Sequence, residues 1–239
     1  PLFYVGGGTV LADGAQAMNE LAAMFNYPVV TTLTGIGGFD GTSLLSLGMV
    51  GMHGTYEANM AMQECDVLFA VGARFDDRVI GNPSDFERPS RTIIQVDVDP
   101  SSISKNVQTD VPIVGDVREV LSEMVRLLKE SGDRPDPAAT AQWVKDITLW
   151  RSKKCLAYKT KKTGPIQPQA VIERVAEAAC NDAYFSTDVG QHQMWAAQYL
   201  KFKKPRHWCT SGGLGTMGYG FPAALGVQVA HPEAQSVLF

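Results

Sequence analysis

Residues 66–78 read DVLFAVGARFDDR. The apolar run 67–71 is short and uninterrupted, which predicts a buried strand. A loop with two arginines and two aspartates in five residues follows at once. Ligands of open α/β sheets bind beyond the carboxyl ends of the strands, where such side chains could grip phosphate or polar ring atoms. A solvated loop with local ion pairs explains the same residues, and the residues alone slightly favour that alternative.

Strands and helices alternate on both sides of this stretch. A helix is expected after the glycine run 6–8, another over 55–62, and a third after Asp116, where apolar residues recur at a helical period. This alternation is typical of βαβ units, so we expect an open parallel sheet within residues 1–130. The other apolar runs that predict its strands are residues 2–5, 28–32, 92–96 and 113–114.

The pattern changes in the polar, proline-containing stretch 131–137. We expect a linker with a long helix over 138–158, and then a second α/β domain that begins near residue 165. Its predicted elements are a helix over 168–179, a strand over 184–187, a strand around Trp208, an Ala/Gly-rich helix over 218–229 with Leu225 in a core, and a strand from Ser236. The three parts are therefore residues 1–130, 131–164 and 165–239, and the strand-like ends suggest a chain cut from a longer polypeptide.

Composition excludes several classes of function. The net charge is −4 and no Lys/Arg block stands out, so we expect neither nucleic acid nor a membrane as partner. The opening residues lack the features of a signal peptide, and no apolar run is long enough to span a bilayer. The four cysteines are irregularly spaced, which fits a reducing cytoplasm and neither a disulfide framework nor a metal site.

Three further places in the first part could contact a phosphorylated ligand. The glycine run 6–8 follows a strand and precedes a helix, where backbone N–H groups can approach a phosphate, although a tight turn explains it equally well. Asp97 ends a strand, where a carboxylate can accept hydrogen bonds from ribose hydroxyls. Asp116 opens a helix, and a simple N-cap is the more natural explanation for it.

Two further places lie in the second part. Residues 188–194, DVGQHQM, join a predicted strand to a helix, and His192 could reach a diphosphate, although a lone histidine is more often structural. Residues 211–220, SGGLGTMGYG, hold five glycines in ten residues at a strand-to-helix junction. A purely structural turn rarely needs so many glycines, so we expect this backbone to approach a ligand closely. Since no nucleophile–base set emerges, the residues alone predict a two-domain α/β protein that binds phosphorylated cofactors.

Four motifs in this order resemble the acetolactate (acetohydroxyacid) synthase large subunits of the thiamine-diphosphate enzyme superfamily. They are LGMVGMHGTYEAN at 47–59, GARFDDR at 72–78, DVGQHQM at 188–194 and SGGLGTMG at 211–218. The resemblance covers the whole chain. It implies a Rossmann-like central domain that binds FAD without net redox, followed by the first half of a thiamine-diphosphate-binding α/β domain.

The resemblance also implies an activity. Such enzymes decarboxylate pyruvate on thiamine diphosphate and join the product to a second 2-ketoacid, pyruvate or 2-ketobutyrate, in branched-chain amino-acid biosynthesis. The cofactor supplies the chemistry, which explains why no catalytic triad is found. The implied cofactors are thiamine diphosphate, Mg²⁺ and FAD, and the implied partners are a second subunit, as a homodimer with a shared site, and a regulatory small subunit in the cytoplasm.

Site residues carry over only where the motifs match. The substrate region matches Met52, Asp77 and Arg78, and Arg78 could meet a ketoacid carboxylate. The flavin positions match His53, Gly72, Ala73, Arg74, Asp76, Asp97 and Asp116. The thiamine-diphosphate positions match Val189, Gly190, Gln191, His192, Gly215 and Met217, together with the adjoining Gln193, Met194, Gly212 and Gly213.

Two parts of the family's machinery are not expected in this chain. They are the glutamate that activates the aminopyrimidine ring and the turn that binds magnesium. We therefore assign no catalytic acid–base residue and no metal ligand here, and expect the chain alone to be inactive. Two alternatives stay open: another thiamine-diphosphate carboligase or oxidase, such as glyoxylate carboligase, and a non-catalytic FAD-binding module.

Overall fold

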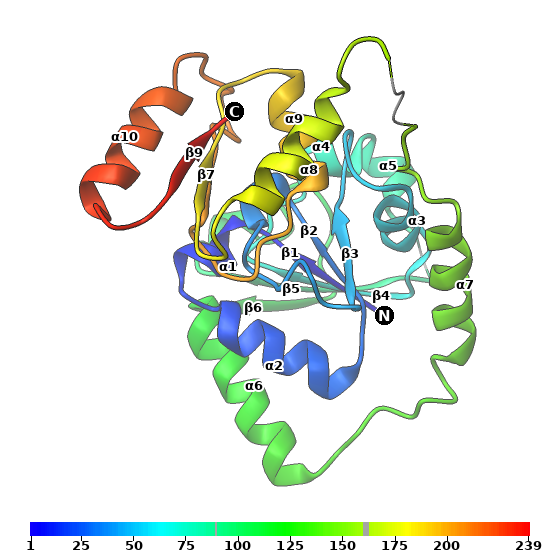
Figure 1. The fold of residues 1–239 in the computed structure, drawn as a ribbon. Helices are drawn as coiled ribbons and strands as arrows, with labels where there is room; N and C mark the ends of the chain where they lie inside the picture. Colours follow the sequence, from blue (N-terminus) through cyan, green and yellow to red (C-terminus); the bar gives the residue numbers. More distant parts are fainter. Residues whose placement is uncertain (89, 160–162) are drawn as a thin grey trace.

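The computed structural model describes residues 1–88, 90–159 and 163–239, and it has the expected α/β architecture (Figure 1). Within these residues a six-stranded parallel sheet has the order β3-β2-β1-β4-β5-β6. Residues 160–162 of the expected linker lie outside the described residues. The strands are β1 Leu2–Val5, β2 Val29–Thr31, β3 Ser46–Met49, β4 Val67–Val71, β5 Thr92–Asp97 and β6 Val111–Val114.

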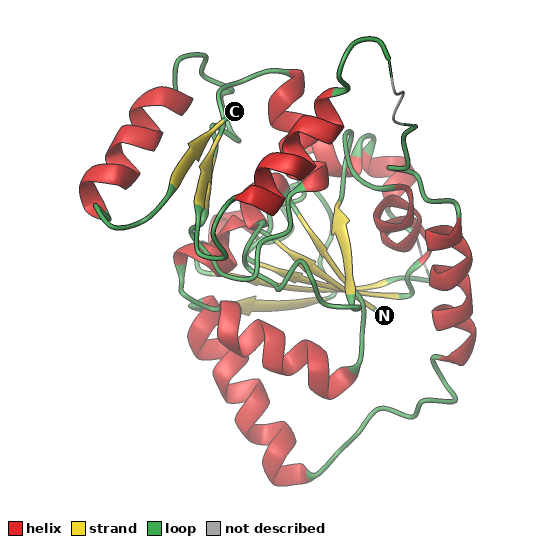
Figure 2. Cartoon of the chain, viewed as in Figure 1, coloured by secondary structure: helices red, strands yellow, loops and turns green. Residues whose placement is uncertain are grey.

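Helices cover both faces of this sheet (Figure 2). Alternate side chains of a strand point to opposite faces, so Leu2 and Tyr4 of β1 join one core cluster and Phe3 and Val5 join the other. The α3 and α7 helices pack on the first face, and α2 and α6 on the second. The helical elements of this part are α1 Gly7–Leu11, α2 Ala15–Phe25, η1 Leu33–Gly35, α3 Tyr56–Glu64, α4 Asp77–Ile80, α5 Pro83–Phe86, η2 Pro100–Ser102, α6 Val117–Ser131 and α7 Ala141–Ser152.

Two helices differ from the sequence-based expectation. The single helix expected after the glycine run is divided into α1 and α2, because Asp13 between them has φ of 55°, in the left-handed region. The helix expected over 138–158 is shorter, since α7 ends at Ser152 and Lys154 has φ of 47°. The α7 helix nevertheless closes the first core, because Ile147 is buried there and the Trp143 indole donates to the Pro1 carbonyl at 2.9 Å.

A second, smaller sheet follows, with β7 in the middle and the order β8-β7-β9. Its strands are parallel, and the α8 and α9 helices pack against one another beside it. Phe185 on β7 lies in its core with Phe202 and Ile172. The elements are α8 Pro168–Ala178, β7 Tyr184–Ser186, α9 Gln191–Tyr199, β8 Trp208–Cys209, α10 Gly220–Ala230 and β9 Ser236–Leu238.

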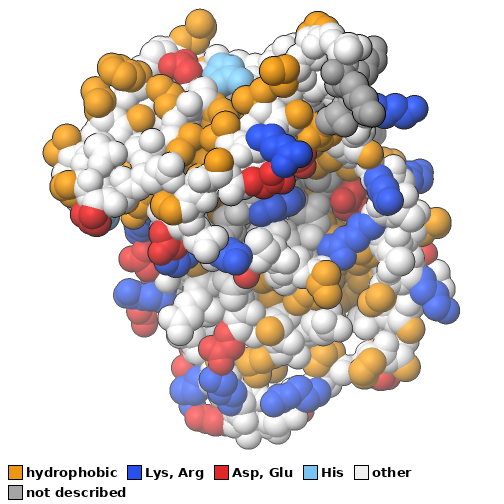
Figure 3. Space-filling model, in the orientation of Figure 1, with side chains coloured by type: hydrophobic (Ala, Val, Ile, Leu, Met, Phe, Trp, Pro, Cys, Tyr) orange, Lys and Arg blue, Asp and Glu red, His pale blue; other side chains and the backbone are white. Residues whose placement is uncertain are grey.

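The expected close packing of the α10 helix is only partly correct. Gly220 is buried, but Leu225, expected in a core, is 51% exposed, and Phe221 and Val229 are 62% and 81% exposed. Hydrophobic side chains accordingly gather on the surface around α10 (Figure 3). Alanine and glycine give the helix only a narrow inward-facing stripe, so its larger apolar residues face outward.

The two sheets are joined by direct contacts between their loops. The Gly41 amide donates to the Phe202 carbonyl at 2.8 Å, and the Gln198 amide group donates to the His53 carbonyl at 2.8 Å. Arg206 pairs with Asp13 at 2.7 Å. Among the described residues, no helix is long and apolar enough to cross a bilayer.

Candidate functional site

The expected flavin-contact residues all lie beyond the carboxyl ends of strands in the first sheet. His53 follows β3, the loop 72–76 follows β4, Asp97 ends β5, and Asp116 follows β6. From β3 to β6 the sheet has five strand spacings, about 24 Å at ~4.8 Å each. The strand order reverses between β1 and β4, which is where such sheets bind ligands. This edge therefore suits an elongated ligand such as a dinucleotide.

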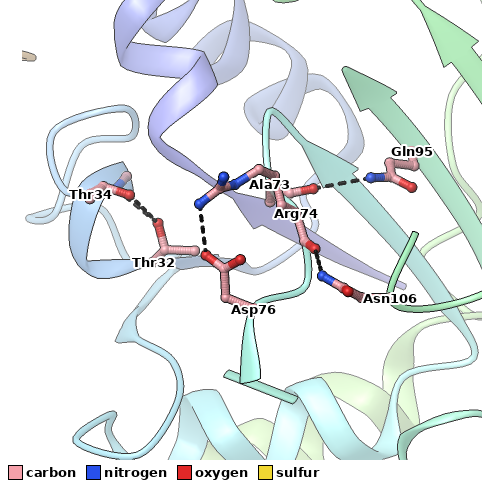
Figure 4. A network of polar contacts seen from close by, with 8 residues as sticks. Thr32, Thr34, Ala73, Arg74, Asp76, Gln95 and Asn106 are labelled. Atoms are coloured by element: carbon pink, nitrogen blue, oxygen red, sulfur yellow. Dashed lines mark hydrogen bonds and ion pairs between the residues drawn. The ribbon is translucent and has the colours of Figure 1, made fainter. Parts of the chain in front are cut away.

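The loop after β4 exposes two charged residues around a buried aromatic one. Phe75 has φ of 56°, is only 1% exposed, and packs against Tyr4 with ring centroids 5.4 Å apart. This insertion leaves Arg74 and Asp76 facing outward, where they form an ion pair at 3.2 Å (Figure 4). The local ion pair considered from sequence is present, and both groups remain more than half exposed, so they are also open to a ligand.

Two neutral side chains hold this loop in place (Figure 4). Gln95 is fully buried on β5, and its amide donates to the Ala73 carbonyl at 3.3 Å. Its side-chain oxygen accepts from the Thr109 hydroxyl at 2.7 Å. Asn106 donates to the Arg74 carbonyl at 2.9 Å. Neutral side chains thus fix the loop backbone, so the position of Arg74 does not depend on an ion pair of its guanidinium.

The glycine run 6–8 is explained by packing of two backbones. A Cβ on Gly6 would overlap the Gly72 carbonyl oxygen, and one on Gly8 would lie 2.8 Å from the Gly72 Cα. The Gly6 and Gly8 amides donate to the Val71 and Gly72 carbonyls at 2.9 and 3.0 Å. These glycines therefore let β1 and β4 end side by side, and the tight-turn explanation accounts for them without a ligand.

Asp97 and Asp116 use their carboxylates differently. Asp97 is 8% exposed, and its Oδ1 accepts from the Asp99 amide at 2.9 Å. Asp116 is the N-cap of α6, and its Oδ1 accepts from the Arg118 and Glu119 amides at 2.9 and 3.2 Å. The N-cap favoured from sequence for Asp116 is present, so contact with a ligand would be an additional role.

The three expected substrate-region residues lie together around one cavity. Met52, Asp77 and Arg78 line a cavity of about 410 Å³ with Met62 and Phe86. The Met52 amide donates to the Arg78 carbonyl at 2.9 Å, and the Arg78 guanidinium lies 3.8 Å from the Met52 sulfur. The Arg78 side chain is 73% exposed. Its Nε lies 3.9 Å from an Asp77 carboxylate oxygen. An exposed arginine beside apolar lining residues suits a small ligand with one carboxylate.

The motifs of the second sheet also meet at the carboxyl end of a strand. Residues 188–190 leave β7 and begin α9, while residues 211–219 lead into α10. The Asp188 carboxylate accepts from the Val189, Gly218 and Gly220 amides at 2.7, 3.0 and 3.3 Å. The two segments that carry the expected thiamine-diphosphate residues are thereby brought side by side.

Gln193 holds the beginning of the loop 211–219 through buried hydrogen bonds. It is 3% exposed, and its amide donates to the Thr210 hydroxyl at 2.7 Å and to the Ser211 carbonyl at 3.2 Å. With its donors directed into the chain, Gln193 is placed to orient the loop rather than to touch a cofactor. By contrast, Leu214 and Met217 are 97% and 80% exposed at the outer side of the loop.

The loops of the two sheets touch one another. A Cβ on Gly212 would lie 2.7 Å from the Thr34 side chain of η1. The Thr34 hydroxyl lies 3.3 Å from that of Thr32, on the side of the first sheet that also carries Arg74 and Asp76 (Figure 4). The two candidate ligand sites are therefore neighbours.

Burial disfavours a nucleophilic role for three of the four cysteines. Burial raises the pKa of the Cys65 thiol to about 11 and also raises the pKa of Cys155 and of Cys209. A reactive cysteine needs a lowered pKa. Within residues 1–88, 90–159 and 163–239, no group of three or more His, Cys, Asp or Glu side chains could hold a metal ion.

Comparison with known proteins agrees with this arrangement. Residues 1–124 match the thiamine pyrophosphate enzyme central domain, and residues 188–239 match the C-terminal TPP binding domain of the same enzymes. The chain belongs to the thiamine pyrophosphate enzyme family.

Its relatives include acetolactate synthase large subunits. The chain is 50% identical over 233 residues to the isozyme 3 large subunit of Escherichia coli K12, covering 98% of this chain and 40% of that protein. It is 46% identical over 237 residues to the large subunit of Haemophilus influenzae, covering 99% and 41%. It is 50% identical over 233 residues to that of Pyropia yezoensis, covering 98% and 39%. The chain thus spans about 40% of the length of these relatives.

The sequence did not reveal the role of several residues that shape the loops after β4 and before α10. Gln95 and Asn106 hold the loop after β4. Asp188 belongs to the motif 188–194 but received no role from sequence, and it holds the loop before α10. Gln95 left a signal, because it is the one polar residue inside the apolar run 93–96. Asn106 left none, since it contacts a residue 32 positions away.

Proposed function

We propose that this chain forms the central and cofactor-binding parts of an acetolactate synthase. One observation carries the proposal: relatives of that name are about 50% identical along almost the whole chain. The enzyme would decarboxylate pyruvate and join the product to a second 2-ketoacid, as a step of valine, leucine and isoleucine biosynthesis. The Met52–Arg78 cavity supports a small carboxylate substrate.

The residues present fit thiamine diphosphate at the loop before α10. Its glycines leave the backbone accessible, and a Cβ on Gly213 would meet no atom within 4 Å. When bound, thiamine diphosphate supplies the means of stabilising the carbanion formed on decarboxylation. The chain's residues bind and orient it: we assign contact to Val189, Gly190, Gln191, His192, Met194, Gly212, Gly213, Gly215 and Met217, and orientation of the loop to Gln193.

FAD, magnesium and partner subunits belong to the same proposal. An elongated dinucleotide fits the sheet edge that carries His53, Arg74, Asp76 and Asp97, with Asp116 at its far end. Mg²⁺ would take its protein ligands from outside the described residues. We also propose a homodimer with a regulatory small subunit, acting in the cytoplasm.

A chimeric enzyme tests this function. Residues 1–239 would replace the matching region of the E. coli isozyme 3 large subunit, here called the chimera. With pyruvate, thiamine diphosphate, Mg²⁺ and FAD, we expect acetolactate at a rate comparable with that of the parent enzyme. A folded chimera that binds both cofactors but makes no acetolactate would contradict the proposal. Tartronate semialdehyde from glyoxylate instead would favour a glyoxylate carboligase, and FAD binding alone would favour a non-catalytic module.

A further inference from the structure

Asp188 lies between the two segments that we assign to thiamine diphosphate, and its side chain joins them. One carboxylate oxygen accepts from the Val189 and Gly218 amides at 2.7 and 3.0 Å, and the other accepts from Gly218 and Gly220 at 3.0 and 3.3 Å. The contacts span 30 and 32 residues of sequence. A single side chain therefore ties the end of β7 to the segment that begins α10.

The glycines of this loop match the contact with Asp188. A Cβ on Gly220 would lie 2.5 Å from the Asp188 amide nitrogen, so a side chain there would push the two segments apart. Gly218 has φ of 86°, which turns its N–H toward the carboxylate in a conformation that other residues rarely adopt. The Asp188 carboxylate explains Gly218 and the Asp188 backbone explains Gly220, whereas Gly213 has no neighbouring atom that requires it.

The contact also accounts for two of the backbone donors of the loop that are not available to a ligand. The Gly212 amide donates to the Thr210 carbonyl, the Thr216 amide to the Ser211 hydroxyl, and the Gly218 and Gly220 amides to Asp188. Within the described part of the chain, the amides of Gly213, Gly215 and Met217 make no such hydrogen bond. The four amides named first are therefore engaged within the chain, whereas those of Gly213, Gly215 and Met217 are free to meet a ligand.

We propose that Asp188 is a positioning residue that fixes the loop 211–220 in the conformation that receives thiamine diphosphate. The inference rests on the proposed function for the identity of the ligand, but the loop contact itself does not. The backbone N–H groups of Val189 and Gly218 hold the pKa of the Asp188 carboxyl below its usual range, so the group is ionised at neutral pH. Its charge is directed at the backbone amides of the two segments that it joins.

Hydrogen exchange on the 239-residue chain tests the contact directly. Asp188→Ala should raise the exchange rates of the Gly218 and Gly220 amides at least tenfold, because both lose their acceptor. Asp188→Asn should give an intermediate increase, since one oxygen can still accept from Gly218. Asp182→Ala is the matched control: that exposed carboxylate precedes β7 and pairs with Lys204 at 2.7 Å. Rates within twofold of wild type in both Asp188 variants would overturn the proposal.

Thiamine-diphosphate titration of the chimera tests the consequence. We expect Asp188→Ala to weaken binding at least tenfold and Asp188→Asn to weaken it less, with FAD affinity and the Asp182→Ala variant unchanged. Faster amide exchange with unchanged thiamine-diphosphate affinity would show that Asp188 stabilises the loop without affecting ligand binding, and would overturn the positioning role. If the Ala variant does not fold, the Asn variant decides by the same two measurements. Failure of the unmutated chimera to bind thiamine diphosphate would instead contradict the proposed function.

Discussion

Arg74 is a charged residue whose backbone is fixed by uncharged neighbours. Asn106 holds its carbonyl, and Gln95 holds that of Ala73. Among the residues that the structure describes, the guanidinium pairs only with Asp76. The pair is exposed and contributes little to stability, about 0–1 kcal/mol. A ligand phosphate could therefore replace or join Asp76 at low cost, which makes Arg74 the sharpest test of the flavin proposal.

Replacing Arg74 with alanine in the chimera should weaken FAD binding more than thiamine-diphosphate binding. Losing one charge-assisted hydrogen bond costs about 1.5–3 kcal/mol, roughly a 10- to 150-fold loss of affinity. Titration of each cofactor measures both affinities. The control is Arg174→Ala, another exposed arginine, which pairs with Glu177 on α8. Unchanged FAD affinity, or an equal loss for both cofactors, would reject the assignment.

The exposure of Met217 shows that it does not fill a core, which is what the proposed cofactor-shaping role requires. It is 80% exposed, whereas Leu121 of α6 is fully buried. Met217→Ala should therefore change the free energy of unfolding by less than about 0.5 kcal/mol, while Leu121→Ala should cost about 2–5 kcal/mol. In the chimera, Met217→Ala should lower turnover at least tenfold, because a misoriented cofactor loses the advantage of its bound geometry. Normal turnover per folded molecule would make Met217 an ordinary surface residue.

At the scale of elements, the start of the α6 helix carries a residue with two candidate roles. Asp116 caps the helix and is also a proposed flavin contact. Gly132 ends the helix with φ of 71°. Val117, Leu121 and Val125 are buried on one face of the helix. This helix was predictable because cap, period and terminal glycine agree in one continuous stretch.

Two substitutions of Asp116 distinguish the roles. Asp116→Ala should destabilise the chain by about 1 kcal/mol, whereas Asp116→Ser should restore the cap and most of that loss. Chemical denaturation measures both. In the chimera, FAD affinity then decides: if Asp116 also contacts the flavin nucleotide, the serine variant stays stable but binds FAD more weakly. Wild-type FAD affinity in the serine variant would leave Asp116 as a cap alone.

In the turn after β1, replacing a glycine should strongly lower the stability of the chain. Gly6→Ala places a methyl group against the Gly72 carbonyl and Ala73, and should cost about 3 kcal/mol as the strand ends are forced apart. Gly213→Ala is the matched control, since no atom lies within 4 Å of its Cβ position, and stability should be unchanged. Thermal unfolding of both variants checks this. A Gly6→Ala variant as stable as wild type would show that the two turns are not tightly packed.

Other elements show where sequence reasoning stops. The buried strands β1 and β4 were predictable because each is an apolar run with glycine after it. The strand β3 was missed because Gly48 and Ser46 interrupt its pattern, and only its pairing with β2 identifies it. Most motif residues could be placed at strand ends, but their mutual contacts depend on strand order, which the sequence does not state.

The arrangement of the whole molecule depends on a few close contacts between the two sheets. Gly37 has φ of 88°, and a Cβ there would lie 2.8 Å from the Lys204 carbonyl oxygen. Arg206 and Asp13, which pair across the same boundary, both have φ above 50°. Loops in uncommon conformations thus hold the two candidate sites side by side, so changing the boundary should affect both without touching either.

Replacing Gly37 with alanine should loosen this boundary while each sheet stays folded. Two costs are involved: the left-handed conformation, about 1–2 kcal/mol, and the clash with the neighbouring sheet. Gly132→Ala isolates the first cost, because Gly132 has φ of 71° with no atom within 4 Å of its Cβ position. We expect faster hydrogen exchange at residues 33–41 and 198–206 in the Gly37 variant alone. In the chimera, that variant should still bind each cofactor but turn over at least tenfold more slowly, because the Met52–Arg78 cavity on the first sheet and the proposed thiamine-diphosphate loop on the second must keep their relative positions during turnover. Equal exchange and equal turnover in the two variants would show that the Gly37 contact does not hold the sheets together.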